Sequence, residues 1–397
     1  MLSKFVNDHR GAVAMMFAFS LFILMAVVGG AIDYAAVFAK RSKIQSAADA
    51  AALAAATSEL NNNEKKEVAE TVFRANFGDD PSVKLNIQIN ANEVDITASD
   101  VHKTTLLQAV GVREVSLEAR ATVPLGKAVN VEVVLVLDYS DSMLDNSKYV
   151  RLREGAELLI DQVTKNGTNP NVRIGVVPFA ALVHADLPSA YVRSDVTYSG
   201  CTQDRRGPYN QQEEAGQSGD PSKWGEVTST HPCLAMQTAG LKVIPLSTNI
   251  ADVKSKVQAM QPYVWTHIAL GAEIGWQVLS PTGPFATGAA YDEKTVYKVF
   301  VLMTDGMQTA PGWGADGTQN VANAEDNLQH ICSAMKSRKI DVFTIGYDLY
   351  DTHTLGLLQS CAKSGGFFDA KDINGGLVTS FKAIGAEIRS AMIRLSK

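Results

Sequence analysis

An uncharged apolar run near the amino terminus is the strongest hydrophobic feature of the chain. Residues 12–32 carry no charged side chain, and a helix of that length reaches about 30 Å, the thickness of a bilayer's hydrocarbon core. The pattern predicts a transmembrane helix over 12–32 after a short cytoplasmic terminus, residues 1–11. A cleavable signal peptide is the alternative, because Lys4 and Arg10 precede the run and small residues occupy 29–31. Retention is favoured, since a signal peptide's apolar core spans only about 7 to 15 residues.

The segment that follows is rich in alanine. Residues 33–62 contain neither Gly nor Pro, and three asparagines at 61–63 suit the end of a helix. We therefore expect the anchor to continue as a stalk helix over 33–62. The small side chains of this segment have two equally good explanations. They give the segment a high helix propensity, or they form a face that another helix can approach closely. These residues are Ala47, Ala48, Ala51, Ala52, Ala54 and Ala55.

Short alternating segments characterise residues 63–126. Apolar and polar residues alternate over 83–89, a turn follows at 90–92, and further strands are expected over 94–97 and near 115–123. The order is helix, strand, strand, helix, strand. We expect a small α+β module that serves packing or presentation, with no chemistry of its own.

Residues 127–397 alternate continuous apolar strands with amphipathic helices. This pattern predicts an α/β domain with a doubly wound, mostly parallel sheet covered by helices on both faces. Regular patterning lapses over about 180–247, which indicates an insertion. The expected strands are 131–137, 172–179, 296–303 and 341–345, and the expected helices are 148–163, 250–260, 268–279, 324–337, one near 354 and one over 373–395.

Composition is that of a folded protein, with 46% hydrophobic and 20% charged residues. The net charge of -6 argues against a nucleic-acid partner, because phosphate binding needs clustered Lys and Arg. The single short basic run is Lys40, Arg41 and Lys43. We therefore expect proteins and a membrane as partners, and no nucleic acid.

Four cysteines, Cys201, Cys233, Cys332 and Cys361, permit two disulfides in three pairings. Joining neighbours closes the two shortest loops. Reduced cytosolic thiols are the alternative, and a zinc site from Cys201, His231 and Cys233 lacks the paired short spacings of zinc motifs. Next to a membrane anchor, disulfides are favoured, and they require an oxidising compartment. Because the charges flanking the apolar run are nearly balanced, the cysteines decide the expected orientation, with the large domain outside the cytoplasm.

A candidate cation site begins where the first strand of the large domain ends. Asp138, Ser140 and Ser142 alternate in Asp-Tyr-Ser-Asp-Ser, and oxygen-bearing side chains at such a turn can converge on one hard cation. Alone the motif is weak, because Ser and Asp commonly cap helices. Thr266 and Asp305 fall in other loops at the carboxyl side of the same predicted sheet, where this architecture binds ligands.

The pattern resembles the metal-ion-dependent adhesion site of the von Willebrand factor A family, with its Asp-x-Ser-x-Ser motif, distant Thr and later Asp. The resemblance implies direct metal contacts from Ser140, Ser142 and Thr266, and contacts through water from Asp138 and Asp305. It implies a divalent cation, Mg²⁺ first, with Ca²⁺ and Mn²⁺ as alternatives. One coordination position would be left for a partner's carboxylate.

Other segments narrow the resemblance to TadE/TadG-like proteins of Flp (tight-adherence) pilus assembly. The segments that carry it are Arg-Gly-Ala-Val-Ala at 10–14, Asp33, Gln-Ser-Ala-Ala-Asp-Ala-Ala-Ala-Leu-Ala at 45–54, Gly-Trp-Gln-Val-Leu-Ser-Pro at 275–281, Leu-Met-Thr-Asp-Gly at 302–306, Leu-Leu at 357–358 and Cys-Ala at 361–362. Three positions depart from the family. Asp141 and Trp265 stand where Gly is usual, and Met16 stands where pilin-like relatives have Glu, so processing as a pseudopilin is not indicated.

The resulting prediction is a single-pass inner-membrane protein whose large domain, in the periplasm or outside the cell, binds a pilus component or a surface ligand without turnover. A hydrolase that pairs Ser140 with His267 is disfavoured, because the Gly-x-Ser-x-Gly motif is missing. The more serious alternative is a structural scaffold of the cell envelope that uses no metal-dependent ligand.

Overall fold

The structure is a computed structural model that describes residues 10–58, 60–90, 92–125, 129–227 and 233–395, with the backbone alone at 10–14 and 26. Lys4 and His231, invoked above, lie outside the described residues. The chain forms two compact units, residues 1–127 and residues 128–397. Each unit is considered by itself.

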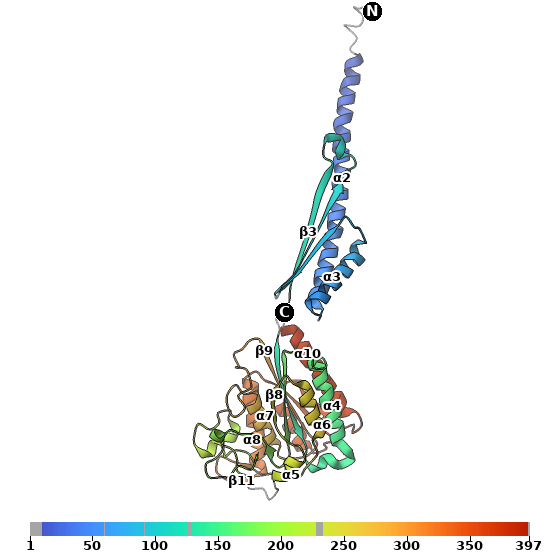
Figure 1. Cartoon of the computed structure of the whole chain (residues 1–397). Coiled ribbons are helices and arrows are strands. Elements are labelled where there is room, and N and C mark those ends of the chain that lie inside the picture. The colour runs from blue at the N-terminus through green and yellow to red at the C-terminus, as the bar shows by residue number, and fades with distance from the viewer. Residues whose placement is uncertain (1–9, 59, 91, 126–128, 228–232, 396–397) are drawn as a thin grey trace, which may run out of the picture. The chain divides into compact units, whose positions relative to one another are not determined.

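One long helix, α2 (Arg10–Thr57), begins the first unit (Figure 1). Among the described residues it is the one helix long and apolar enough, by length and composition, to cross a membrane. Its side chains between Met15 and Val28 are exposed wherever they are described.

The small α+β module has the expected order of elements. Helix α3 (Asn62–Phe77) is followed by strands β1 (Lys84–Ile89) and β2 (Glu93–Lys103), the 3₁₀ turn η1 (Leu107–Val110) and strand β3 (Glu114–Pro124). The strands form an antiparallel sheet in the order β1-β2-β3. The second helix expected from the sequence is only the short turn η1.

The second half of α2 is part of this module, so residues 33–62 do not form a separate stalk. It packs against α3, β2 and β3. Its small side chains are what allow this approach, and they form a core with apolar side chains of α3 and the sheet. The fully buried ones are Ala47, Ala48, Ala51, Ala52 and Ala55.

The asparagines at 61–63 begin a helix and do not end one. Helix α2 stops at Thr57, and Asn61 caps α3. The Asn61 side chain accepts hydrogen bonds from the amides of Asn63 and Glu64, at 3.0 and 3.1 Å, while the Glu64 carboxylate accepts from the Asn61 amide. This reciprocal capping box explains the difference, because asparagine satisfies free amides at a helix start.

The second unit is built on a mixed six-stranded sheet in the order β13-β12-β9-β4-β5-β8. The pairings from β13 to β5 are parallel, and β8 runs antiparallel to β5 at the edge. The expected α/β class is confirmed. The sheet is a mixed one, so the doubly wound, mostly parallel arrangement stays a prediction, and the two short outer strands were not predicted. The strands are β4 (Asn130–Asp138), β5 (Val172–Phe179), β8 (Ile244–Ser247), β9 (Val296–Thr304), β12 (Asp341–Tyr347) and β13 (Phe367–Ala370).

Helices pack on both faces of the sheet and form a separate hydrophobic core with each face. One core contains α4 (Lys148–Thr164), α6 (Ile250–Ala259) and α10 (Gly376–Leu395), and the other contains α7 (Ile268–Leu279), α8 (Val321–Ser337) and α9 (Thr352–Cys361). In Figure 1, α4, α6 and α10 lie on one side of the sheet, and α7 and α8 lie on the other.

Helix α7 is buried along its whole length and lies very close to the sheet. A Cβ on Gly275 would lie 2.5 Å from a methyl of Val136 and 2.7 Å from the ring of Phe300, so only glycine fits there. This contact fixes α7 against β4 and β9.

The insertion is ordered by short elements and a disulfide. Its elements are β6 (Val183–His184), η3 (Ser189–Tyr191), β7 (Cys201–Thr202), η4 (Tyr209–Gln211), η5 (Asp220–Ser222) and α5 (Cys233–Thr238). The disulfides join Cys201 to Cys233 and Cys332 to Cys361. The two expected disulfides are therefore confirmed, and they join neighbours, which is one of the three pairings that the sequence left open. The zinc alternative at Cys201 and Cys233 is wrong because their sulfurs are bonded to each other.

Candidate cation site at the carboxyl end of the sheet

Asp138 is the last residue of β4 and is fully buried. One carboxylate oxygen accepts a hydrogen bond from the Ser140 amide at 2.8 Å, and the other accepts from the Thr304 hydroxyl at 2.6 Å. Because β4 and β9 are parallel neighbours, their last residues meet at one edge of the sheet. Thr304 was not among the predicted site residues.

The first and third loops meet through two serine hydroxyls and a carboxylate. The hydroxyl oxygens of Ser140 and Ser142 are 3.0 Å apart, and Ser142 donates a hydrogen bond of 2.6 Å to Asp305. Residues that the sequence separates by 163 positions are thus in direct contact.

The second loop brings the Thr266 hydroxyl to the same place. A Cβ added to Gly306 would lie 3.6 Å from the Ser142 hydroxyl oxygen and 3.6 Å from the Thr266 hydroxyl oxygen. The space above Gly306 is therefore bordered by oxygen atoms of two loops. Thr266 is held by Thr309, whose hydroxyl accepts from the Thr266 amide at 2.9 Å.

Main-chain hydrogen bonds tie the three loops together. The Tyr263 amide donates to the Tyr139 carbonyl at 2.6 Å, and the His267 amide donates to the Ala180 carbonyl at 2.9 Å. The Thr309 amide donates to the Thr266 carbonyl at 3.0 Å. The positions of the hydroxyls are consequently set by the backbone of the sheet edge.

The donor atoms fit a small hard cation. All are hydroxyl or carboxylate oxygens, and neighbouring ligands of an octahedral Mg²⁺ lie about 2.9 Å apart. The 3.0 Å between the Ser140 and Ser142 hydroxyls matches this spacing. Within the described ranges no group of three or more His, Cys, Asp or Glu side chains is placed to hold a metal, so a cation here would depend on the hydroxyls.

Burial makes the two aspartates costly to ionise. It raises the pKa of Asp138 to about 7, and the nearby charge of Asp305 adds to the effect. Burial also raises the pKa of Asp305, against the hydrogen bond from Ser142 and the charge of Lys148. A divalent cation would stabilise both carboxylates in the ionised form.

Lys148 is a feature that the sequence reasoning missed. Its ammonium group lies 3.0 Å from a carboxylate oxygen of Asp305 and 3.0 Å from one of Asp348. A signal was present, because Lys148 is the first residue of α4, and the partial positive charge of a helix start disfavours a cation there. A lysine at that position indicates nearby carboxylates.

Three large apolar side chains stand exposed in the loops of the site. Leu144, Trp265 and Met307 are 54%, 51% and 52% exposed. Each lies within two residues of a predicted ligand: Leu144 after Ser142, Trp265 before Thr266, and Met307 after Asp305. Leu144 and Met307 were not singled out from the sequence, because an isolated apolar residue in a loop has no periodic pattern.

The Ser140 and His267 pair, considered as a hydrolytic site, is engaged elsewhere. The Ser140 hydroxyl contacts Ser142, while Nδ1 of His267 accepts from the Leu270 amide at 3.3 Å and Nε2 lies 3.5 Å from Asp204. His267 thus caps α7 and faces the insertion.

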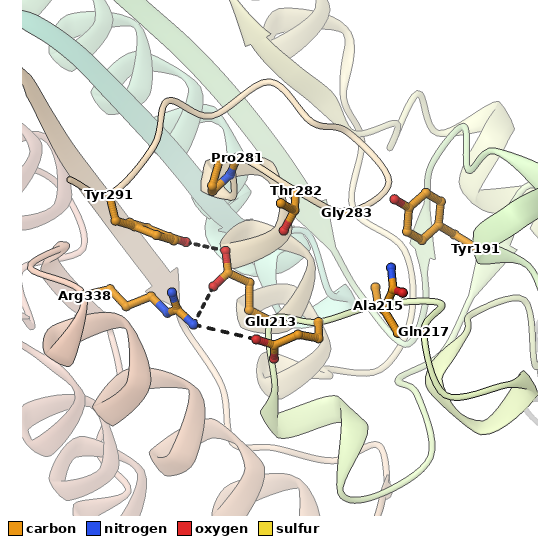
Figure 2. A pocket seen from close by; sticks show the side chains of 10 residues that line it. Tyr191, Glu213, Ala215, Gln217, Pro281, Thr282, Gly283, Tyr291 and Arg338 are labelled. Atoms are coloured by element: carbon orange, nitrogen blue, oxygen red, sulfur yellow. Dashed lines mark hydrogen bonds and ion pairs between the residues drawn. The ribbon is translucent and has the colours of Figure 1, made fainter. Parts of the chain in front are cut away.

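A cavity of about 390 Å³ lies apart from these residues, where the insertion meets the loop after α7 (Figure 2). The Glu213 carboxylate accepts hydrogen bonds from the hydroxyls of Tyr291 and Ser280, at 2.8 and 2.5 Å. It also forms an ion pair of 3.0 Å with Arg338. Figure 2 shows Tyr291 and Arg338 both pointing at Glu213. With these partners, Glu213 attaches the insertion to the body of the unit.

A buried ion pair provides another attachment. The Arg205 guanidinium, fully buried, contacts the Glu273 carboxylate of α7 at 2.7 Å and stacks 4.4 Å from the ring centre of Trp224. Burial raises the pKa of Glu273 to about 7, although Arg205 opposes the shift.

The amino-terminal segment matches a known protein family. Residues 11–58 match the family model Tad, described as "Putative Flp pilus-assembly TadE/G-like", which confirms the resemblance over that segment. A comparison with curated protein sequences found no match.

Similar solved structures include three from bacterial pili. The pilus adhesin SpaC of Lactobacillus rhamnosus GG is 11% identical with a TM-score of 0.43, over 78% of this chain and 34% of that one. The vWF domain of the type V pili tip protein Mfa5 of Porphyromonas gingivalis is 15% identical with a TM-score of 0.43, over 67% and 97%. The pilus adhesin RrgA of Streptococcus pneumoniae is 14% identical with a TM-score of 0.36, over 78% and 49%. The chain thus spans about a third of SpaC and half of RrgA.

Proposed function

We propose that this chain is a membrane-anchored protein that binds a partner protein through a divalent cation, in the assembly of a Flp pilus or in attachment to a surface. The observation that carries the proposal is the meeting of three loops above Gly306. There the Ser142 hydroxyl contacts Asp305, and the Thr266 hydroxyl borders the same space. In this proposal the second unit has a von Willebrand factor A-type fold.

Mg²⁺ is the first candidate, with Ca²⁺ and Mn²⁺ as alternatives for the same oxygen donors. Ser140, Ser142 and Thr266 would hold it directly, and Asp138 and Asp305 through water. When bound, the cation offers a coordination position to a carboxylate of the partner. The exposed side chains of Leu144, Trp265 and Met307 would add apolar contact around it.

Pilus assembly is proposed because residues 11–58 match the TadE/G-like model. Helix α2 supports anchoring in the inner membrane by a single pass. The two disulfides support placement of the second unit in the periplasm or outside the cell, since thiols stay reduced in the cytosol. The partner would be a pilus component or a surface ligand, and no nucleic acid is expected.

We also propose that the site works by binding and without turnover. Its serine hydroxyls are engaged with each other and with Asp305. His267, the general base considered from the sequence, is engaged in capping α7.

One observation favours a second candidate, a structural scaffold of the cell envelope. Lys148 already supplies a positive charge to Asp305, at 3.0 Å. A site whose charge is balanced from within could stabilise the fold and never meet a ligand.

Cation binding by the full-length protein in lipid nanodiscs separates the two candidates. Mn²⁺ binding, followed by its paramagnetic resonance signal, should saturate at one site and be displaced by Mg²⁺. Asp138→Ala should lose binding, and Asp326→Ala, an exposed position on α8, should keep it. Wild-type protein that binds no cation would refute the metal proposal. Should Asp138→Ala fail to fold, Ser142→Ala carries the same test.

The same variants test the biological role in cells. Loss of pilus assembly or attachment with normal folding supports cation-mediated binding, whereas normal assembly with the Asp138→Ala chain supports the scaffold. Cross-linking in the native envelope with and without a chelator should capture a partner only while the cation is present.

A further inference from the structure

The connection between β2 and β3, residues 104–113, is fastened to α2 near the end of its apolar part. We call it the η1 loop. The Asp33 carboxylate accepts hydrogen bonds from three successive amides, and those from Leu106 and Leu107 are 2.8 and 2.7 Å long. The η1 loop is therefore held at the level of α2 where the uncharged run of the sequence ends.

Close packing reinforces this attachment. A Cβ on Gly29 would lie 2.8 Å from the Cβ of Leu106, and one on Gly30 would lie 3.4 Å from a methyl of Leu107. The small residues at 29–31, which suggested a cleavage site, are thus part of the helix that the η1 loop packs against. Cleavage there would separate the loop from its packing surface.

Apolar side chains of the η1 loop remain exposed despite this packing. Leu106, Val110 and Val112 are 45%, 48% and 44% exposed. On α2 the exposed rings of Tyr34 and Phe38 lie next along the helix from Asp33 and stack with centroids 6.5 Å apart.

Basic residues flank the apolar ones. Lys103 ends β2 and Arg113 precedes β3, and both side chains are exposed. The apolar part of α2 is therefore followed by exposed aromatic rings on the helix and exposed apolar side chains in the loop, and cations stand at the two ends of the loop. That is the order of side chains at the boundary between hydrocarbon and head groups.

We propose that the η1 loop lies in the interface of the bilayer that α2 crosses, as a second membrane contact beside the helix. The inference rests on the proposed membrane anchoring. Continuity identifies the bilayer as the occupant, because the exposed apolar loop adjoins the exposed apolar surface of α2 between Met15 and Val28. Interfacial segments bury their apolar side chains about 5 to 10 Å deep.

A second contact has a mechanical consequence. A single helix leaves the module free to rotate and tilt about its axis, whereas the helix and the loop together fix the direction in which β2 and β3 leave the membrane. Because the hydrogen bonds of the Asp33 carboxylate join the η1 loop to α2, the helix and the loop would move together.

Depth-dependent fluorescence quenching of the full-length protein in nanodiscs tests the inference. With the native cysteines in disulfides, a thiol introduced without reductant is the reactive one for a fluorophore. Val110→Cys probes the η1 loop, Phe22→Cys probes the apolar part of α2, and Asn92→Cys probes the β1–β2 turn as a control. The quenchers are lipids spin-labelled near the head group, lipids labelled at mid-chain, and aqueous iodide.

We expect shallow lipids to quench Val110 severalfold more than Asn92, and mid-chain lipids to quench Phe22 most strongly. If lipids quench Phe22 while Val110 responds only to iodide, the loop inference is wrong and the anchor stands. If lipids leave Phe22 unquenched, the proposed anchor itself fails. A Val110 probe shielded from both lipid and iodide would mean that protein covers the loop, and this too overturns the inference.

Discussion

The hydroxyl of Ser142 donates a hydrogen bond of 2.6 Å to the carboxylate of Asp305, which lies 163 residues later in the chain. Ser142 follows β4 and Asp305 follows β9, and these strands are parallel neighbours in the sheet. The contact therefore depends on the order of strands. Any change in their pairing would separate the two loops and with them the oxygen donors of the site.

Gly306→Ala should weaken cation binding without unfolding the protein. The added methyl would lie 3.6 Å from the hydroxyl oxygens of Ser142 and Thr266, an ordinary contact distance, but it would occupy the space they border. We expect Mn²⁺ affinity to fall by at least about tenfold, as for other changes around metal sites. Gly356→Ala on α9, where a Cβ meets nothing within 4 Å, is the matched control. Unchanged affinity in Gly306→Ala would place the cation elsewhere.

Lys148→Met should make the stability of the second unit depend more strongly on Mg²⁺. Removing the ammonium group of Lys148 leaves the carboxylates of Asp305 and Asp348 without their positively charged partner. When no metal is present, this should lower the free energy of unfolding by about 3 kcal/mol. Mg²⁺ should restore most of it, and the affinity for Mg²⁺ should rise. Denaturant unfolding with chelator and with Mg²⁺ measures both effects, with the exposed Arg151→Met as control. Equal destabilisation under the two conditions would favour the scaffold.

Glu273 should make stability fall as pH rises toward neutrality. Burial raises its native pKa from 4.5 to about 7, so the folded state binds the proton more tightly than the unfolded state. The resulting stabilisation is complete below pH 4.5 and is lost as pH rises through about 7, by an amount of the order of 3 kcal/mol. Glu273→Gln should lack this part of the pH dependence. Parallel stability curves for wild type and variant between those two pH values would contradict the prediction.

The disulfide between Cys201 and Cys233 should hold the insertion in place. It closes a loop with a sequence separation of 32, for which a cross-link contributes about 3 to 4 kcal/mol. The double variant Cys201→Ser, Cys233→Ser should lose about that much stability and be cut faster by proteases within 180–247. Thiol titration of the denatured wild-type protein should find no reactive thiols before reduction and four after it. Two or more thiols without reductant would refute the pairing.

Asp33→Ala should release the η1 loop from α2. Three amides lose a charged acceptor, so the attachment of the loop to α2 is weakened. Hydrogen exchange of residues 105–107 should accelerate strongly, while the core of β2 and β3 stays protected. Asp49→Ala, an exposed aspartate on the same helix, should leave the exchange of this loop as in wild type. Slow exchange in Asp33→Ala would show that packing alone holds the loop.

Much of the second unit was predictable because its elements have strong periodicity. The strand expected over 172–179 and the helix expected over 268–279 have the same bounds in the structure. The edge strands β8 and β13 were missed, since four residues are too few to show a pattern and their pairing comes from the neighbouring strand. Asn61 was misjudged for a related reason, because a polar residue between two helices can cap either one.

Local chemistry was therefore determined by the sequence itself: the apolar helix, the strands of the sheet centre, the oxygen-bearing motif and the cysteines. Only the tertiary structure decided which distant groups meet. It placed Lys148 against Asp305, packed the supposed stalk into the small module and laid the η1 loop on Asp33. The physical reason is the distance along the sequence over which each effect acts. Periodicity and propensity act over a few residues, whereas an ion pair or a helix contact depends on how strands separated by more than a hundred residues are ordered in space.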